Sequence, residues 1–215
     1  MTTRSIVVTS GSPANGYFHC STFGAPTAFL APLQVVAELQ SYDFSAMRMW
    51  AYGGGPLGAD MARKLADSYR SDRFVQVYGM TESGPLGTVL YPEEAIAKAG
   101  SIGRAGVPGV AVEVRRADGE RCSAGEVGEI HLRSPAIMKG YLDNPEASAA
   151  AFDDEGWYRS GDLARIDEDG FLFIVDRLRD MIVTGGENVY SKEVEDVLAM
   201  HPDVQDVAVI GRPHP

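Results

Sequence analysis

The sequence predicts an α/β fold in which a layer of parallel strands and helices precedes a smaller antiparallel β subdomain. Before residue 100, short apolar runs end in glycine and alternate with segments of helical periodicity, as in a parallel sheet covered by helices. After residue 100, apolar residues recur with a period of two, and Asp-Gly pairs stand at 118–119 and 169–170. Such pairs are typical of turns between antiparallel strands.

The first part of the chain, residues 1–99, is expected to form the parallel α/β layer. The predicted elements are helices over 29–37 and 57–69 and strands over 47–52 and 74–78. Glycines follow both strands, namely Gly53, Gly54, Gly55 and Gly79. Because ligands of such sheets bind beyond the carboxyl ends of the strands, we expect these glycines to line a binding edge.

Residues 100–178 are expected to form a small antiparallel, barrel-like subdomain, either a barrel or a distorted sheet. Strands are predicted around 110–114, 129–133 and 171–174. In the second of these, Ile130 and Leu132 alternate with polar residues, so His131 is expected to face solvent.

The last segment, residues 179–215, is expected to begin a small α+β domain. A helix is predicted to start at Ser191, with that serine as its cap. Its apolar residues Val194, Val197 and Leu198 are expected to face inward, and a strand is predicted over 207–210.

Composition narrows the classes of function. The chain has 215 residues and a net charge of −11, which argues against binding to a nucleic-acid backbone. It has two cysteines, too few for a disulfide framework, so a reducing, cytoplasmic location is expected. No apolar run reaches the roughly 18 residues that would predict a membrane span. A homo-oligomer remains an open expectation.

Several residues combine chemistry suited to a nucleotide. Tyr78 offers a flat face on which adenine can stack, and the hydroxyl of Thr81 can donate to a phosphate oxygen. The carboxylate of Asp162 can accept from both hydroxyls of a ribose, and Gly161 allows close backbone approach. The residues also have a purely structural interpretation. Tyr78 and its neighbours could form a strand end with a capped turn, and Asp162 could be an exposed turn cap.

Three motifs, taken in order, resemble the adenylate-forming superfamily, which includes acyl-CoA synthetases. They are Tyr-Gly-Met-Thr-Glu at 78–82, Gly-Asp-Leu at 161–163, and Asp-Arg-Leu-Arg-Asp-Met-Ile-Val-Thr-Gly-Gly-Glu-Asn at 176–188. The resemblance extends over about residues 23–215. It implies that Glu82 holds Mg²⁺ near the phosphates of ATP, that Thr81 and Glu82 are catalytic, and that Asp162 binds the ribose.

The resemblance assigns further roles. It implies that Arg177 contacts the ribose and phosphates, although a surface ion pair with Asp176 or Asp180 would also explain this residue. Arg179 matches the family's hinge. Gly185 and Gly186 are expected near the coenzyme A tunnel or, alternatively, in a plain tight turn. The triple glycine at 53–55 resembles a turn beside the adenine and acyl pocket.

The implied activity is that of an ATP-dependent acyl-CoA synthetase, which converts a fatty or aryl acid to an acyl-adenylate and then to a coenzyme A thioester. Residues 9–16 resemble the family's phosphate loop only weakly and contain no lysine, and the family's catalytic lysine would follow Pro215. The chain is therefore expected to be a fragment or truncation. The alternatives are a non-catalytic module that binds nucleotide or a partner, and part of a peptide-synthetase adenylation domain.

Overall fold

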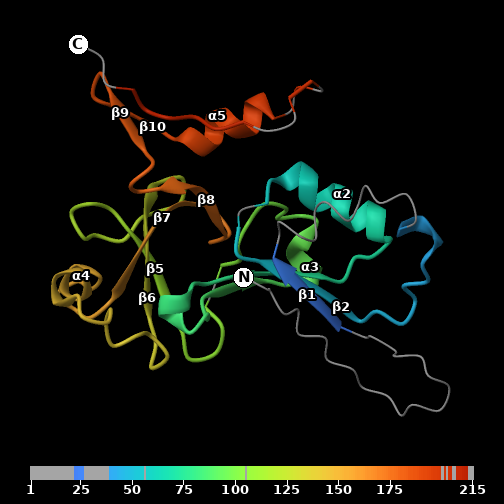
Figure 1. Ribbon diagram of the computed structural model, residues 1–215, viewed down its shortest axis with the longest axis horizontal. Coiled ribbons are helices and arrows are strands. Elements are labelled where there is room, and N and C mark those ends of the chain that lie inside the picture. Colours follow the sequence, from blue (N-terminus) through green and yellow to red (C-terminus); the bar gives the residue numbers. More distant parts are fainter. Residues whose placement is uncertain are drawn as a thin grey trace. The chain divides into compact units, whose positions relative to one another are not determined.

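The computed structural model describes residues 22–26, 39–55, 57–104, 106–199, 201, 203–204 and 207–212. The chain divides into two compact units, Met1–Val107 and Pro108–Pro215, which we call the first and second units (Figure 1). The predicted helix over 29–37 and the segment 9–16 lie outside the described residues. The boundaries expected from the sequence, near residues 99 and 178, stay predictions.

The first unit contains a four-stranded sheet of order β1-β2-β3-β4. Its strands are β1 (Thr22–Pro26), β2 (Met49–Gly53), β3 (Phe74–Tyr78) and β4 (Thr88–Leu90). The first three are parallel, and β4 joins β3 antiparallel. The predicted parallel α/β layer is confirmed, with an antiparallel strand at its edge.

Helices and short 3₁₀ turns lie between these strands or follow the last of them. They are η1 (Leu39–Ser41), α2 (Ala59–Tyr69), η2 (Thr81–Ser83) and α3 (Pro92–Ala95). Helix α2 links the parallel strands β2 and β3, as a βαβ crossover requires. Within the part of the chain that the structure describes, no helix combines the length and apolar character needed to cross a bilayer.

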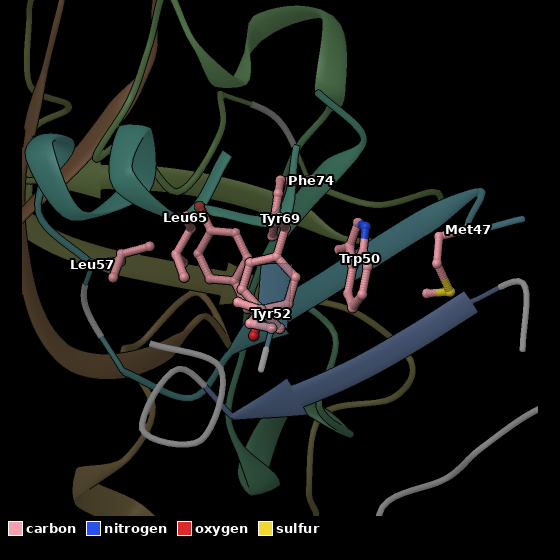
Figure 2. Close-up of a cluster of buried hydrophobic side chains, with 8 residues drawn as sticks. Met47, Trp50, Tyr52, Leu57, Leu65, Tyr69 and Phe74 are labelled. Carbon is pink, nitrogen blue, oxygen red and sulfur yellow. The ribbon is translucent and has the colours of Figure 1, made fainter. Parts of the chain in front are cut away.

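An aromatic cluster between α2 and the sheet forms the core of the first unit (Figure 2). Trp50 of β2 lies with its ring centroid 4.7 Å from that of Tyr69 on α2 and 6.1 Å from that of Phe74 on β3. Leu65, one turn before Tyr69 on the helix, is 1% exposed. Buried aromatic rings dominate core energetics, so this cluster fixes α2 against β2 and β3.

The second unit contains a four-stranded antiparallel sheet of order β5-β6-β7-β8. Its strands are β5 (Ala111–Arg115), β6 (Val127–Arg133), β7 (Tyr158–Ile166) and β8 (Leu172–Arg177). Among the described residues β5 and β8 do not pair with each other, so the sheet is open. Of the two expected forms, a barrel or a distorted sheet, the second unit therefore has the open sheet, because period-two strands and Asp-Gly turns predict antiparallel neighbours but not whether the edge strands meet.

Smaller elements complete the second unit. They are α4 (Pro145–Ala150), the hairpin strands β9 (Ile182–Thr184) and β10 (Glu187–Val189), and α5 (Ser191–Leu198). Two expectations for this end of the chain are wrong. On α5, Val194, Val197 and Leu198 are 37%, 59% and 44% exposed. Residues 207–210 form no strand, and the Val209 amide donates to the Glu195 side chain instead.

Candidate functional site

The carboxyl ends of β2 and β3 lie together at one edge of the first sheet. Gly53 stands opposite Val77 in the parallel register, which places Gly54 and Gly55 beside the turn that begins at Tyr78. A side chain at position 53 would put its Cβ 2.2 Å from the Val77 carbonyl oxygen. The sheet therefore requires glycine here. The glycines at 53–55 lie close to the turn after β3, as expected for a binding edge. Their roles in binding a ligand stay predictions.

The turn after β3 is held by a residue that motif analysis did not single out. Ser83 is fully buried. Its hydroxyl accepts from the Met80 amide at 3.1 Å and donates to the Met80 carbonyl at 3.0 Å. Gly79 is required in this turn, since a Cβ there would lie 1.9 Å from the Pro85 carbonyl oxygen. In the sequence, the one sign of these hydrogen bonds is that a serine stands three residues after Met80.

This turn presents the two predicted catalytic residues at the surface. Thr81 is exposed, and Glu82 and Tyr78 are partly exposed. Thr81 begins the short η2 turn. The motif is therefore a strand end followed by a turn, as the structural alternative predicted, and the side chains of Tyr78, Thr81 and Glu82 remain accessible to a ligand. Among the described residues, no three His, Cys, Asp or Glu side chains cluster as a metal site. A single carboxylate suits Mg²⁺, which binds through one or two carboxylates, waters and substrate phosphates.

The other predicted nucleotide residues belong to the second unit. Asp162 of β7 stands directly opposite Arg177 of β8, and the Arg177 Nε lies 3.8 Å from Asp162 Oδ1. The Asp162 side chain is 21% exposed and that of Arg177 59%. Asp162 is thus a strand residue and not an exposed turn cap. The guanidinium of Arg177 pairs with Asp162, whereas Asp180 pairs with Arg179.

Gly161 allows β7 to bulge at this point. Three residues of β7, 160–162, stand opposite the single residue Ile130 of β6. Gly161 has φ +73°, a conformation that glycine adopts without steric cost. The Gly161 amide donates to Glu129 Oε1 at 3.0 Å, and its carbonyl accepts from the Leu178 amide at 2.7 Å.

Glu129 belongs to a buried polar network on one face of β5 and β6. Its partners include Arg159, with Nη2 at 3.3 Å from Oε2, and His131, with Nε2 at 3.5 Å. Burial by itself would raise the pKa of Glu129. Hydrogen bonds from His131 and the Gly161 amide and the charge of Arg159 outweigh burial, so the pKa lies below its ordinary value.

His131 corrects one expectation from the sequence. It is 6% exposed and not solvated, and its Nδ1 lies 3.2 Å from Asp153 Oδ2. The same carboxylate oxygen accepts from Arg115 at 3.2 Å. The alternation on β6 is real, but its polar face is covered by the segment that carries Asp153. Alternation predicts two faces and does not predict what covers each.

The glycine pair at 185–186 forms a hairpin turn. Thr184 pairs with Glu187, and the two glycines have φ +58° and +85°, as a two-residue turn between strands requires. The tight-turn alternative is therefore confirmed for the backbone, and a role near coenzyme A stays a prediction. Arg179, expected at the hinge, is 74% exposed in the preceding turn.

The start of α5 also differs from expectation. Tyr190 is the N-cap of the helix, and Ser191 is its first residue. The Ser191 hydroxyl and amide bond to the buried carboxylate of Asp176, at 3.0–3.1 and 2.6 Å. Ser191 therefore ties the helix to β8 and does not cap it.

Comparison with known proteins agrees with the motifs. A family model described as AMP-binding enzyme matches residues 18–142. The feruloyl-CoA synthase of an Amycolatopsis species is 45% identical over 195 residues, 90% of this chain and 38% of that protein. The long-chain-fatty-acid–CoA ligase FadD13 of Mycobacterium tuberculosis is 43% identical over 88% of this chain and 37% of its own length.

Solved structures show the same relationship. The amide bond synthetase McbA of Marinactinospora thermotolerans superposes with a TM-score of 0.80 and 34% identity, over 91% of this chain and 40% of its own. The O-succinylbenzoate coenzyme A synthetase of Bacillus subtilis, solved with ATP and magnesium, gives 0.79 and 33% over the same shares. The chain thus spans about two fifths of the proteins it matches. The chain belongs to the adenylate-forming, AMP-binding enzyme family, and its relatives include proteins named as CoA synthases and CoA ligases.

Proposed function

We propose that this chain provides adenine- and ribose-binding residues for an ATP-dependent acid–CoA ligase. The observation that carries the proposal is the cross-strand pair of Asp162 and Arg177. A carboxylate and a permanently charged guanidinium stand side by side on a bulged strand. The carboxylate can accept from both ribose hydroxyls, and the arginine can donate to ribose and phosphate oxygens.

The turn after β3 would serve the base and the phosphates. Tyr78 would stack on adenine, and Thr81 would donate its hydroxyl to a phosphate oxygen. Glu82 is the residue that would hold Mg²⁺, which when bound offsets the negative charge of the phosphates. The carboxylate of the acid would attack the α-phosphorus of ATP and expel pyrophosphate, a step that is faster when that negative charge is offset. The short turn, in which Ser83 bonds to the Met80 backbone, would hold Thr81 and Glu82 in place for this task.

In the second half-reaction the thiol of coenzyme A would attack the acyl carbonyl of the adenylate, which forms the thioester and releases AMP. Two relatives support a thiol acceptor, because both are named as CoA-forming enzymes and share 45% and 43% identity with this chain. The acid would be aryl or fatty, as the names of these two relatives indicate. The Gly185–Gly186 turn would let the pantetheine arm approach the backbone closely.

Calorimetry of AMP binding to the 215-residue chain tests this proposal. Asp162→Ala removes the acceptor of both ribose hydroxyls and should weaken binding by about 1.5–3 kcal/mol, the range for bonds to charged groups. Asp154→Ala is the matched control, because Asp154 is an exposed carboxylate of the same unit. AMP binding that both variants leave unchanged would show that the ribose role is wrong.

A further inference from the structure

The bulge that carries Asp162 needs an acceptor that the sheet does not supply. Between the pairs His131–Arg159 and Glu129–Leu163, β6 contributes one residue and β7 contributes three. A bulge of this kind leaves extra backbone groups without a ladder partner. Unpaired backbone amides away from water cost free energy, so the conformation of residues 160–162 depends on other groups.

The Glu129 side chain supplies that acceptor. Its Oε1 accepts from the amide of Gly161, the residue directly before Asp162, at 3.0 Å. On the other side of the bulge, the Asp162 amide donates to the Ser160 hydroxyl at 3.1 Å. A hydrogen bond to an ionised carboxylate is stronger than one between neutral groups, and the carboxylate of Glu129 therefore stabilises the backbone conformation at Gly161.

Glu129 is itself held in place from two directions. Arg159 contacts Oε2 with both Nε and Nη2 at 3.3 Å, and His131 Nε2 lies 3.5 Å from the same oxygen. Asp153 in turn fixes His131 from the opposite side of the ring. One carboxylate oxygen is thus used for anchoring and the other for the Gly161 amide. This division gives Glu129 a defined orientation, which a positioning group requires.

We infer that Glu129 is a positioning residue that sets the bulge of β7 and thereby aims the Asp162 carboxylate at the ribose. The inference rests on the proposed function, because it takes Asp162 as the ribose acceptor. It extends that function to a buried residue that has no contact with the nucleotide in this scheme. Its contribution to AMP binding should pass through Asp162 alone.

The test compares Glu129→Ala with Glu113→Ala in the 215-residue chain. Glu113 is a fitting control because it lies on the same face, opposite His131 in the register, with its side chain 10% exposed like that of Glu129. It contacts Arg115 and Arg121. Amide hydrogen exchange at Gly161, followed by NMR, reports the bulge, and calorimetry reports AMP binding.

Glu129→Ala should speed exchange at Gly161 and weaken AMP binding by about tenfold each, as for the loss of one charge-assisted bond. Glu113→Ala should change neither. In an Asp162→Ala background, Glu129→Ala should cause no further loss of AMP affinity. Glu129→Gln keeps an oxygen for the Gly161 amide, so it should restore part of both quantities. If Glu129→Ala fails to fold, Glu129→Gln decides, with a shifted Gly161 resonance and an intermediate loss of affinity expected.

Unchanged exchange at Gly161, or a loss of affinity that simply adds to that of Asp162→Ala, would overturn the inference. Failure of the inference is distinguishable from failure of the proposed function. If Asp162→Ala weakens AMP binding and Glu129→Ala does not, only the role of Glu129 is wrong. If the unaltered chain binds no AMP, the proposed function is wrong and the positioning role falls with it.

Discussion

The carboxylate of Asp176 receives both the amide and the hydroxyl of Ser191, at 2.6 Å and 3.0–3.1 Å. Asp176 is buried at the end of β8, and Ser191 begins α5. The Asp176 carboxylate therefore joins the two ends of the segment that contains the predicted hinge at Arg179. A turn and a hairpin lie between them, and the α5 end of this segment is anchored.

The first prediction concerns this anchor. Asp176→Ala should release α5 and lower the free energy of unfolding by about 1–3 kcal/mol, because the Ser191 amide loses its buried acceptor. Limited proteolysis should then cut faster between residues 177 and 192. Asp154→Ala, which removes an exposed carboxylate, should leave the cleavage rate unchanged. Equal rates in both variants would mean that Asp176 does not restrain the segment.

A second prediction concerns the turn after β3. Gly79→Ala should destabilise the chain by about 1–3 kcal/mol, the usual cost of overpacking, because the new Cβ would lie 1.9 Å from the Pro85 carbonyl oxygen. Gly24→Ala on β1 is the matched control, since the nearest atom to a Cβ there is the Ala51 Cβ at 3.8 Å, an ordinary contact. Urea denaturation measures both. Similar stabilities for the two variants would contradict the requirement for glycine at position 79.

Acid should weaken the second unit through Glu129. The pKa of Glu129 is lower in the folded chain than its ordinary value of 4.5, so the folded state binds fewer protons than the unfolded state. The stabilisation is complete above about pH 4.5 and is lost as the pH falls through the lower folded-state pKa. Glu129→Gln should therefore flatten the decline in unfolding free energy below pH 4.5, whereas Glu120→Gln at an exposed position should not. The measurement is urea denaturation at a series of pH values, and identical slopes for both variants would refute the role.

The last prediction concerns turnover. The 215-residue chain alone should show no ATP–pyrophosphate exchange with fatty or aryl acids above background. It spans about two fifths of the length of its relatives, 38% for the feruloyl-CoA synthase. The family resemblance implies two lysines, one in the phosphate loop and one catalytic lysine, and this sequence matches neither. Loss of a single electrostatic donor commonly costs about 10²–10³ in rate. Glu93→Ala, at an exposed residue of α3, is the control. The prediction is contradicted if the chain catalyses exchange, and if Glu82→Ala abolishes that exchange while Glu93→Ala preserves it.

The sequence determined the family, the position of the motifs and several of the elements. Strand β3 occupies the predicted residues 74–78, and α2 begins two residues after the start of the predicted helix. Local patterns sufficed here, because helical periodicity, glycine stops and Asp-Gly turns act over a few neighbouring residues. The placement of Gly53 beside the end of β3 also followed, since parallel strands end at one edge.

Tertiary structure alone decided which groups surround the site. The acceptor for Gly161 comes from Glu129, 32 residues earlier, and the cover over His131 comes from Asp153, 22 residues later. The sheet edges of β5 and β8 stay open, a choice between barrel and open sheet that the sequence left undecided. The apolar side of α5 stays exposed, although the pattern in the sequence pointed the other way. Each of these outcomes depends on contacts between segments far apart in the chain, and periodicity within one segment carries no information about its distant partner.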